Sequence, residues 1–320
     1  MNSEGKKMLK YHLETQISVK DICDKSDYFY IEYFAKRDDD EKLFLGIPLL
    51  VSDGGKYYPV FGKKYINSSI QEQHPLQYSF VAEKSGTPCE LFNGLILLTQ
   101  EMKGFNIIER AHALRKLYDI DEKVDNTILK VLGIPNNERY LRGYLTLATA
   151  SDKIKELVLH KRINEITAFE IFQFDRNDWE IVAGFIADIK LGTKKRNEVV
   201  NMIYDVMRRD RMRVEEIVES DAVREILTLK MDRLHIGQRL YSYFETVCHP
   251  YISQYKKRFY DKLREVGIER YFRLKIPQNF EDWKFDITFT FSSVDDFKKK
   301  VEILDEIGSR QSFQELMSLR

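Results

Sequence analysis

The stretch LGIPNNERYLRGYLTL, residues 132–147, carries side chains that can read a nucleic acid. Arginine can form two hydrogen bonds to guanine, and asparagine can do the same to adenine. A helix N-terminus in the same stretch would favour a phosphate. The alternative is a corner between two packed helices, with its arginines in solvent. The candidate DNA-contacting residues are Asn136, Asn137, Arg139, Tyr140, Arg142 and Thr146.

A helix, a turn and a second helix must position these side chains. Gly133 stands where a first helix would end in a left-handed conformation, and Pro135 favours a turn. Asn137 is the expected N-cap of a recognition helix over 137–148. The helical spacing i, i+3, i+4, i+7 predicts an inward face made of Leu141, Tyr144, Leu145 and Ala148. Arg139, Arg142 and Thr146 then share the other face.

Two downstream clusters add positive charge at expected helix starts. Cations there oppose the helix dipole, so they suit a bound phosphate better than helix stability. Between 190 and 213 there are eight Lys or Arg residues and three acidic residues. The alternative is a solvated basic face. The candidate phosphate contacts are Lys161, Arg162, Thr167, Thr193, Lys194, Lys195 and Arg196.

The composition of the whole chain favours no nucleic-acid partner by itself. The 320 residues contain 51 Lys and Arg and 51 Asp and Glu, so the net charge is zero. Three cysteines without a CxxC pair predict neither a disulfide framework nor a zinc site, and are typical of a reducing cytoplasm. The chain has no apolar run of 18 residues and no apolar signal-peptide core near its first residue. Neither a membrane span nor a metal is therefore expected.

The spacing of apolar residues predicts an α+β fold in three parts. Residues 1–90 read as a small mixed α/β domain, with strands at 27–35, 43–52, 56–61 and 76–84 and a turn at 53–55. Residues 91–215 read as an all-helical domain that contains the helix–turn–helix. Residues 216–320 read as a long helix broken at Pro250, followed by a β–β–α unit. We expect this unit to expose an apolar strand face and to bury it against a second copy.

The order of these pieces resembles the ParB/KorB partition-protein family. FNIIERAHALRKL (105–117) resembles the family's LNPLEEA helix, with Glu109 and Ala111 in matching places. TILKVLG (127–133) resembles the first helix of its DNA-binding motif, and residues 141–174 resemble the recognition helix and the segment that follows. LGTKKRNEVVNMI (191–203) is similar to its GLSVRELE helix. The resemblance implies a DNA-binding dimer with a C-terminal dimerisation domain, and it covers about residues 20–215.

The sequence departs from the family at two places. Leu141 lies eight residues beyond Gly133, which predicts a turn about two residues longer than the family's. Many members also bind CTP through a GERR box and an ENxQR box. GKKYINSS aligns with the first and supplies Gly62, Lys63 and Lys64 as candidate nucleotide-binding residues. In the second, Thr99 and Met102 replace Asn and Arg, and Met102 cannot coordinate a triphosphate.

These observations predict a non-enzymatic, sequence-specific DNA-binding homodimer that acts in chromosome or plasmid partition or in transcription regulation. No cofactor is expected, and CTP with magnesium is the alternative that the N-terminal boxes leave open. The expected partners are double-stranded DNA and a second copy, and the resemblance adds a ParA-like ATPase. The expected location is the nucleoid in the cytoplasm. Two further readings are a protein–protein adaptor on the same scaffold and a nucleotide-switched DNA clamp.

Overall fold

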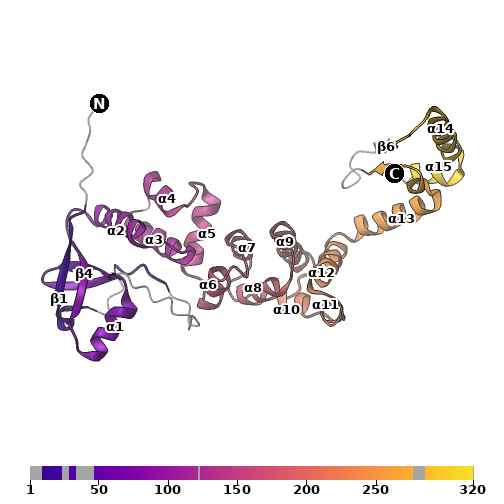
Figure 1. The fold of residues 1–320 in the computed structure, drawn as a ribbon. Helices are drawn as coiled ribbons and strands as arrows, with labels where there is room; N and C mark the ends of the chain where they lie inside the picture. Colours follow the sequence, from indigo (N-terminus) through magenta and orange to yellow (C-terminus); the bar gives the residue numbers. More distant parts are fainter. Residues whose placement is uncertain (1–8, 24–28, 34–46, 122, 277–284, 320) are drawn as a thin grey trace. The chain divides into compact units, whose positions relative to one another are not determined.

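The computed structural model describes residues 9–23, 29–33, 47–121, 123–276 and 285–319. Within these residues a four-stranded sheet near the N-terminus is followed by a series of helices and a second, two-stranded sheet (Figure 1). The chain divides into two compact units, residues 1–201 and 202–320. The predicted class, mixed α and β, is therefore confirmed. Among the described residues, no helix is long and apolar enough to cross a membrane.

The N-terminal sheet has the strand order β1-β4-β2-β3. Strands β2 and β4 are parallel, and the other neighbours are antiparallel. A tight turn with positive φ at Gly54 and Gly55 joins β2 to β3, as the sequence predicts. The elements are β1 (Tyr11–Ile17), β2 (Leu49–Asp53), β3 (Lys56–Phe61), α1 (Lys63–Glu72) and β4 (Leu76–Glu83), with a 3-10 turn at Val19–Asp21.

The strand predictions for this sheet are mostly confirmed. Strands β3 and β4 form where the sequence predicts them, whereas β2 forms only in the second half of the predicted strand 43–52, of which residues 43–46 lie outside the described residues. The prediction of a strand over 27–35 is wrong for the part that the structure describes, because Phe29–Tyr33 are not in a strand. This segment instead donates a hydrogen bond from Ile31 to the carbonyl of Val60, and the rest of 27–35 lies outside the described residues. Strand β1 was not predicted.

Helices then fill the predicted helical region. Most begin at a polar residue whose side chain accepts a backbone N–H, such as Thr87, Asn106 and Asp125. α4 packs mainly against α2, whereas α5 packs against α3 and α7. The helices are α2 (Pro88–Met102), α3 (Ile107–Ile120), α4 (Asn126–Leu132), α5 (Glu138–Ala148), α6 (Asp152–Leu159), α7 (Glu165–Ile171), α8 (Trp179–Asp188) and α9 (Thr193–Asp210).

The second unit continues with helices and ends in the predicted β–β–α arrangement. Pro250 is the first residue of α13 and separates it from α12, as expected, but the predicted long helix is also interrupted at residues 228–232, between α11 and α12. β5 and β6 pair in antiparallel fashion, and Ser293 caps α14. The elements are α10 (Val214–Val218), α11 (Asp221–Leu227), α12 (Arg233–Cys248), α13 (Pro250–Val266), β5 (Arg273–Lys275), β6 (Asp286–Thr288), α14 (Val294–Ser309) and α15 (Gln311–Met317), with a 3-10 turn at Ile268–Arg270.

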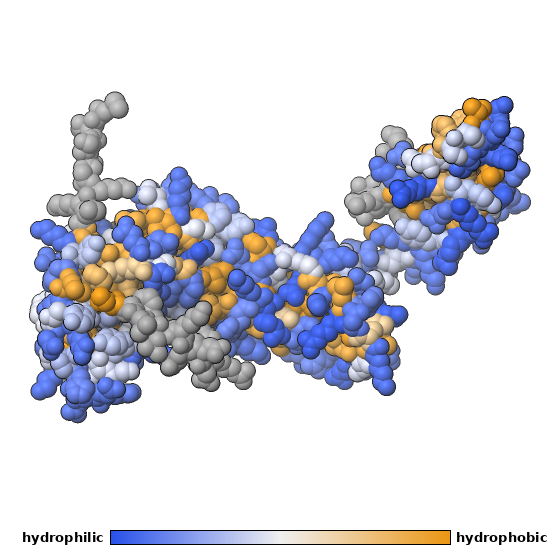
Figure 2. All heavy atoms as spheres, viewed as in Figure 1, coloured by the Kyte–Doolittle hydropathy of each residue, from blue (hydrophilic) through white to orange (hydrophobic). Residues whose placement is uncertain are grey.

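The expected exposed strand face is wrong in its location. Leu274 on β5, Ile287 on β6 and Phe285 just before β6 pack against the core of their own unit. The exposed apolar surface lies instead on α14 and the residues before it, and Figure 2 shows apolar surface over this helix. It consists of Phe291, Val294, Phe297 and Val301, which are 57%, 70%, 40% and 42% exposed. We call these four residues the α14 apolar face.

Candidate nucleic-acid interface

The connection between α4 and α5 has the local structure that the sequence predicts. Gly133 ends α4 with a φ of 67°, and the amide of Ile134 donates to the carbonyl of Leu129 at 2.9 Å. The side-chain oxygen of Asn137 accepts the amide of Tyr140 at 3.1 Å, so Asn137 is the N-cap of α5. Asn136 donates from its side chain to that of Asn126 and ties the turn to the start of α4. The predicted positions of the cap and the turn are confirmed.

The predicted inward face of α5 is confirmed at Tyr144 and wrong at Leu141, Leu145 and Ala148, because the buried face is rotated by part of a turn. The buried residues of α5 are Gly143, Tyr144 and Leu147, whereas Leu141 and Leu145 are only partly buried. The reason is the ring of Phe169 in α7, which lies directly against Gly143. A Cβ atom on Gly143 would come within 2.5 Å of that ring. Gly143 is therefore a packing position, and it is not available for base contacts.

Helix α7 holds α5 at three points. The hydroxyl of Tyr144 donates to Glu165 at 3.1 Å, and burial raises the pKa of this hydroxyl. The rings of Tyr144 and Phe169 meet edge to face with centroids 5.4 Å apart. Arg139 forms an ion pair with Glu170. α7 thus fixes the orientation of α5, and Arg139 lies at the edge of the exposed face with its charge already paired.

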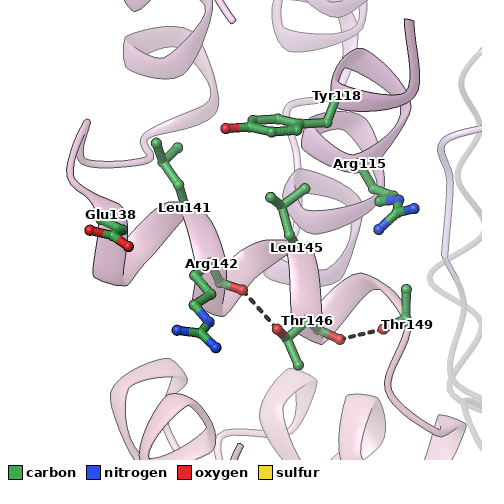
Figure 3. Close-up of a pocket in the computed structure, with 8 residues that line it drawn as sticks. All are labelled: Arg115, Tyr118, Glu138, Leu141, Arg142, Leu145, Thr146 and Thr149. Carbon is green, nitrogen blue, oxygen red and sulfur yellow. Dashed lines mark hydrogen bonds between the residues drawn. The ribbon is translucent and has the colours of Figure 1, made fainter. Parts of the chain in front are cut away.

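The outward face of α5 forms one wall of a shallow groove of about 510 Å³ (Figure 3). Leu141 and Leu145 point toward Tyr118 of α3, and Arg142 and Thr146 extend along the other side of the helix. The hydroxyl of Thr146 donates to the carbonyl of Arg142 at 2.9 Å. The lining residues are Arg115, Tyr118, Glu138, Leu141, Arg142, Leu145, Thr146 and Thr149.

Arg142 is the cation of this groove that can receive a ligand. Its guanidinium is exposed and forms no hydrogen bond or ion pair with the residues that the structure describes. Arg115, in contrast, is paired with Asp119 at 2.9 Å. A guanidinium on the outward face of a rigidly held helix can meet a base edge or a phosphate without first breaking an internal pair.

The second cluster of candidates joins the α6–α7 turn to the start of α9. The side-chain amide of Asn164 donates to the hydroxyl of Thr193 at 2.9 Å. Arg196 donates to the carbonyl of Arg162 at 2.7 Å, and Arg162 is paired with Asp188 at 2.8 Å. Thr193, Arg162 and Arg196 were predicted as phosphate contacts from the sequence. Asn164 and Asp188, which bring them together, were not predicted.

Positive charge in this cluster is incompletely neutralised. Burial and the neighbouring Arg162 lower the pKa of Arg196, whose buried Nε has no hydrogen-bond partner in the described structure. Lys161 and Lys194 are exposed, and neither has a partner among the described residues. Lys195 is exposed as well, and the first turn of α9 contains no acidic residue. An anion at this helix start would therefore be favoured.

Some of the predicted phosphate contacts have structural roles instead. Thr167 is fully buried, and its hydroxyl donates to Asn197 at 2.6 Å, so it cannot contact a phosphate. It links α7 to α9. In the second unit, Arg209 donates to the carbonyl of Cys248 at 2.8 Å. Arg213 pairs with Glu216 at the start of α10. Some of the excess basic residues in 190–213 therefore make contacts within the protein.

An internal carboxylate occupies the Gly62-Lys63-Lys64 turn. Gly62 caps α1 with a φ of 84°, and Oε2 of Glu32 accepts the amides of Gly62 at 2.7 Å and Lys63 at 3.3 Å. The ammonium group of Lys63 lies 4.8 Å from the centre of the Tyr30 ring. A phosphate at this helix start would have to displace Glu32, because both would need the same amide groups.

The residues that align with the ENxQR box are also partly turned toward the protein interior. Thr99 is fully buried, and its hydroxyl donates to the carbonyl of Leu95 at 2.7 Å. Lys103, at the end of α2, pairs with the buried carboxylate of Glu109 at 2.6 Å. The Thr99 hydroxyl is thus bonded within α2, and Lys103 connects the end of α2 to α3.

Other side chains of types that can take part in catalysis or binding are either packed in the interior or lie outside the described residues. His112 meets Tyr33 edge to face at 5.7 Å, and burial lowers the pKa of His112 to about 4. Trp179 donates from its indole to the carbonyl of Phe174 at 2.9 Å. Trp283 and Asp38–Asp40 lie outside the described residues. Among the residues described, no group of three His, Cys, Asp or Glu side chains could hold a metal ion.

A comparison with protein-family models finds no match to this chain. A search of curated proteins finds no significant match either.

Proposed function

We propose that the protein binds double-stranded DNA in a sequence-specific manner, without catalysis. α5 would enter the major groove with Arg142 and Thr146 toward base edges. The Lys161, Arg162 and Arg196 cluster would contact phosphates. The observation that carries this proposal is the outward face of α5: a capped helix, fixed by α7, presents the guanidinium of Arg142, which has no partner among the described residues. The resemblance to the ParB/KorB family supports the same reading.

We further propose that the protein acts as a homodimer. The α14 apolar face gives the reason, because exposed phenylalanine and valine side chains at helical spacing favour burial against a matching surface. Two copies would place two recognition helices on one DNA site. The family resemblance extends the proposal to chromosome or plasmid partition, or transcription regulation, with a ParA-like ATPase as partner and a nucleoid location.

The two alternatives make different predictions. A nucleotide-switched clamp requires CTP binding at Gly62, Lys63 and Lys64, which Glu32 opposes by occupying the amides of that turn. Equilibrium titration with labelled CTP, with and without DNA, distinguishes this reading. An adaptor would bind no DNA at all. In-vitro selection of sites from random duplexes by the purified full chain tests the main proposal, and failure to enrich any sequence would reject it.

Lys194→Ala is expected to weaken DNA binding to a similar degree at every sequence. Lys194 is exposed at the start of α9 and has no partner among the described residues, so we assign it to a phosphate. The slope of log affinity against log salt should fall in magnitude by about one unit. Fluorescence anisotropy at several salt concentrations measures this slope. An unchanged slope would remove Lys194 from the interface.

Arg142→Ala is expected to cost about 1–3 kcal/mol of binding free energy at the selected site. The loss should be much smaller on an unrelated duplex, because a base contact carries sequence information and a phosphate contact does not. Arg264→Ala is the matched control, since Arg264 is also exposed but is paired with Asp261 on α13 in the second unit. Equal losses on both duplexes would show that Arg142 contacts the backbone.

A further inference from the structure

We propose that Leu141 and Leu145, together with Tyr118, recognise the methyl groups of thymine in the major groove. This inference rests on the proposed DNA binding and deepens it, because it names the bases that one side of α5 would read. It predicts sites in which thymine lies beside the base or phosphate contacted by Arg142.

The arrangement of α5 separates apolar from polar readout. Leu141 and Leu145 are one turn apart and form a row that points toward the ring of Tyr118 (Figure 3). Arg142 and Thr146 are also one turn apart and form a second row on the other side of the exposed face. A helix in the major groove presents two such rows to two neighbouring sets of base edges. The leucine row can contact only an apolar group there, and thymine is the base that offers one.

The packing of α5 on α3 leaves these leucines only partly buried. The core contacts of α5 are made by Gly143, Tyr144 and Leu147, so the leucines are not required on the inward face. They remain partly exposed beside Tyr118, in a groove that water can enter. Burial of the two leucine side chains against a methyl group would be favourable, because it removes their exposed apolar surface from water.

The charges at the groove favour DNA over an apolar peptide. Arg115 is paired with Asp119, whereas Arg142 has no partner among the described residues, so an unneutralised guanidinium lies beside the leucine row. A thymine methyl lies near the negatively charged backbone, and an apolar row flanked by arginines matches that combination. An apolar peptide segment would leave Arg142 without a partner.

Replacement of thymine by deoxyuridine in the selected site tests the proposal on the unmodified protein. Each substitution removes one methyl group and leaves the hydrogen-bonding edge of the base unchanged. At a contacted position the affinity should fall about fourfold, which corresponds to one buried methyl-sized group. Elsewhere in the site it should not change, so the positions that respond map the row.

Variants of the two rows provide the matched comparison. Leu141→Ala with Leu145→Ala should bind the selected site more weakly and should lose the response to deoxyuridine. Arg142→Ala should bind more weakly and keep that response. Both leucines are partly exposed, so these variants are expected to fold, and far-UV circular dichroism checks this.

The outcomes separate the inference from the proposed function. Specific binding that ignores deoxyuridine at every position would overturn the inference and leave DNA binding intact. Specific binding that is unaffected by the double leucine variant would also overturn it, and would assign the groove to a protein partner. Absence of any specific DNA binding would overturn the proposed function together with the inference.

Discussion

Gly143→Ala is expected to destabilise the protein by about 1–2 kcal/mol and to weaken DNA binding. The new Cβ atom would lie 2.5–2.6 Å from three atoms of the Phe169 ring, closer than packed atoms can approach. Forcing extra atoms into a packed position costs about 1–3 kcal/mol, and three contacts below 3 Å with a rigid ring place Gly143 in the upper part of that range, about 2–3 kcal/mol. The higher helix propensity of alanine returns about 1 kcal/mol, which is not enough to offset the clash. Chemical denaturation followed by the fluorescence of Trp179 in unit 1 would measure the change.

Gly184→Ala is the matched control for this prediction. Gly184 lies inside α8, and no atom of the described residues, apart from its chain neighbours and the backbone of α8, lies within 4 Å of where its Cβ would be. The same chemical change should therefore leave stability unchanged or raise it by up to about 1 kcal/mol. Phe169→Leu should reduce the cost of Gly143→Ala, because the two positions share the contact. Similar effects of the two glycine substitutions would contradict the proposed packing of α5 on α7.

Glu32→Ala is expected to lower the free energy of unfolding by about 2–4 kcal/mol, the largest loss that we predict. The carboxylate is 4% exposed and accepts the amides of Gly62 and Lys63. Its removal leaves a buried N–H without an acceptor and creates a cavity beside Lys103. Equilibrium urea unfolding of the full chain measures the loss. Glu72→Ala at the exposed end of α1 is the control, and an equal effect there would contradict the assigned role.

The charge of Glu32 makes a separate prediction about pH. Burial raises the pKa of Glu32 above its ordinary value of 4.5, although Lys103 acts in the opposite direction and the carboxylate of Glu109 reinforces the rise. The folded protein therefore keeps this proton to a higher pH than the unfolded chain does. The contribution of Glu32 to stability is present in full below pH 4.5 and decreases as the pH rises through the folded-state pKa.

Glu32→Gln should remove this pH dependence and keep most of the stability. The amide oxygen of Gln can still accept from Gly62, and the side chain carries no charge that burial would penalise. The stability of the wild type relative to Glu32→Gln should therefore decrease from pH 4.5 upward. A constant difference across this range would show that Glu32 titrates in the folded protein as it does in the unfolded chain.

The sequence by itself determined the features that depend on a few neighbouring residues. Gly133 ends α4 and Asn137 caps α5, because a left-handed residue and a capping side chain act within one turn of their own positions. Pro250 separates α12 from α13 for the same local reason. The strands β2, β3 and β4 follow from β-rich runs and a two-glycine turn. These predictions needed no knowledge of distant contacts.

Only the tertiary structure decided which face of α5 is buried. Leu141, Tyr144, Leu145 and Ala148 have the spacing of an inward stripe, but Tyr140, Gly143, Tyr144 and Leu147 have the same spacing. Hydrophobicity favoured the first set, since a glycine adds no apolar side chain. The ring of Phe169 selected the second, because it fills the space that the missing Cβ leaves.

The dependence on contacts between distant elements also explains the other differences between the predicted and the observed roles of residues. Thr167 and Glu32 carry polar groups, which are expected to face water when only the local sequence is known. In the structure each is buried against a partner about 30 positions away in the chain. Such pairs arise from packing between elements, and no local pattern encodes them. The sequence therefore determined where the candidate recognition helix begins. The packing of α7 determined which of its side chains, Arg142 and Leu145 among them, remain free to meet a ligand.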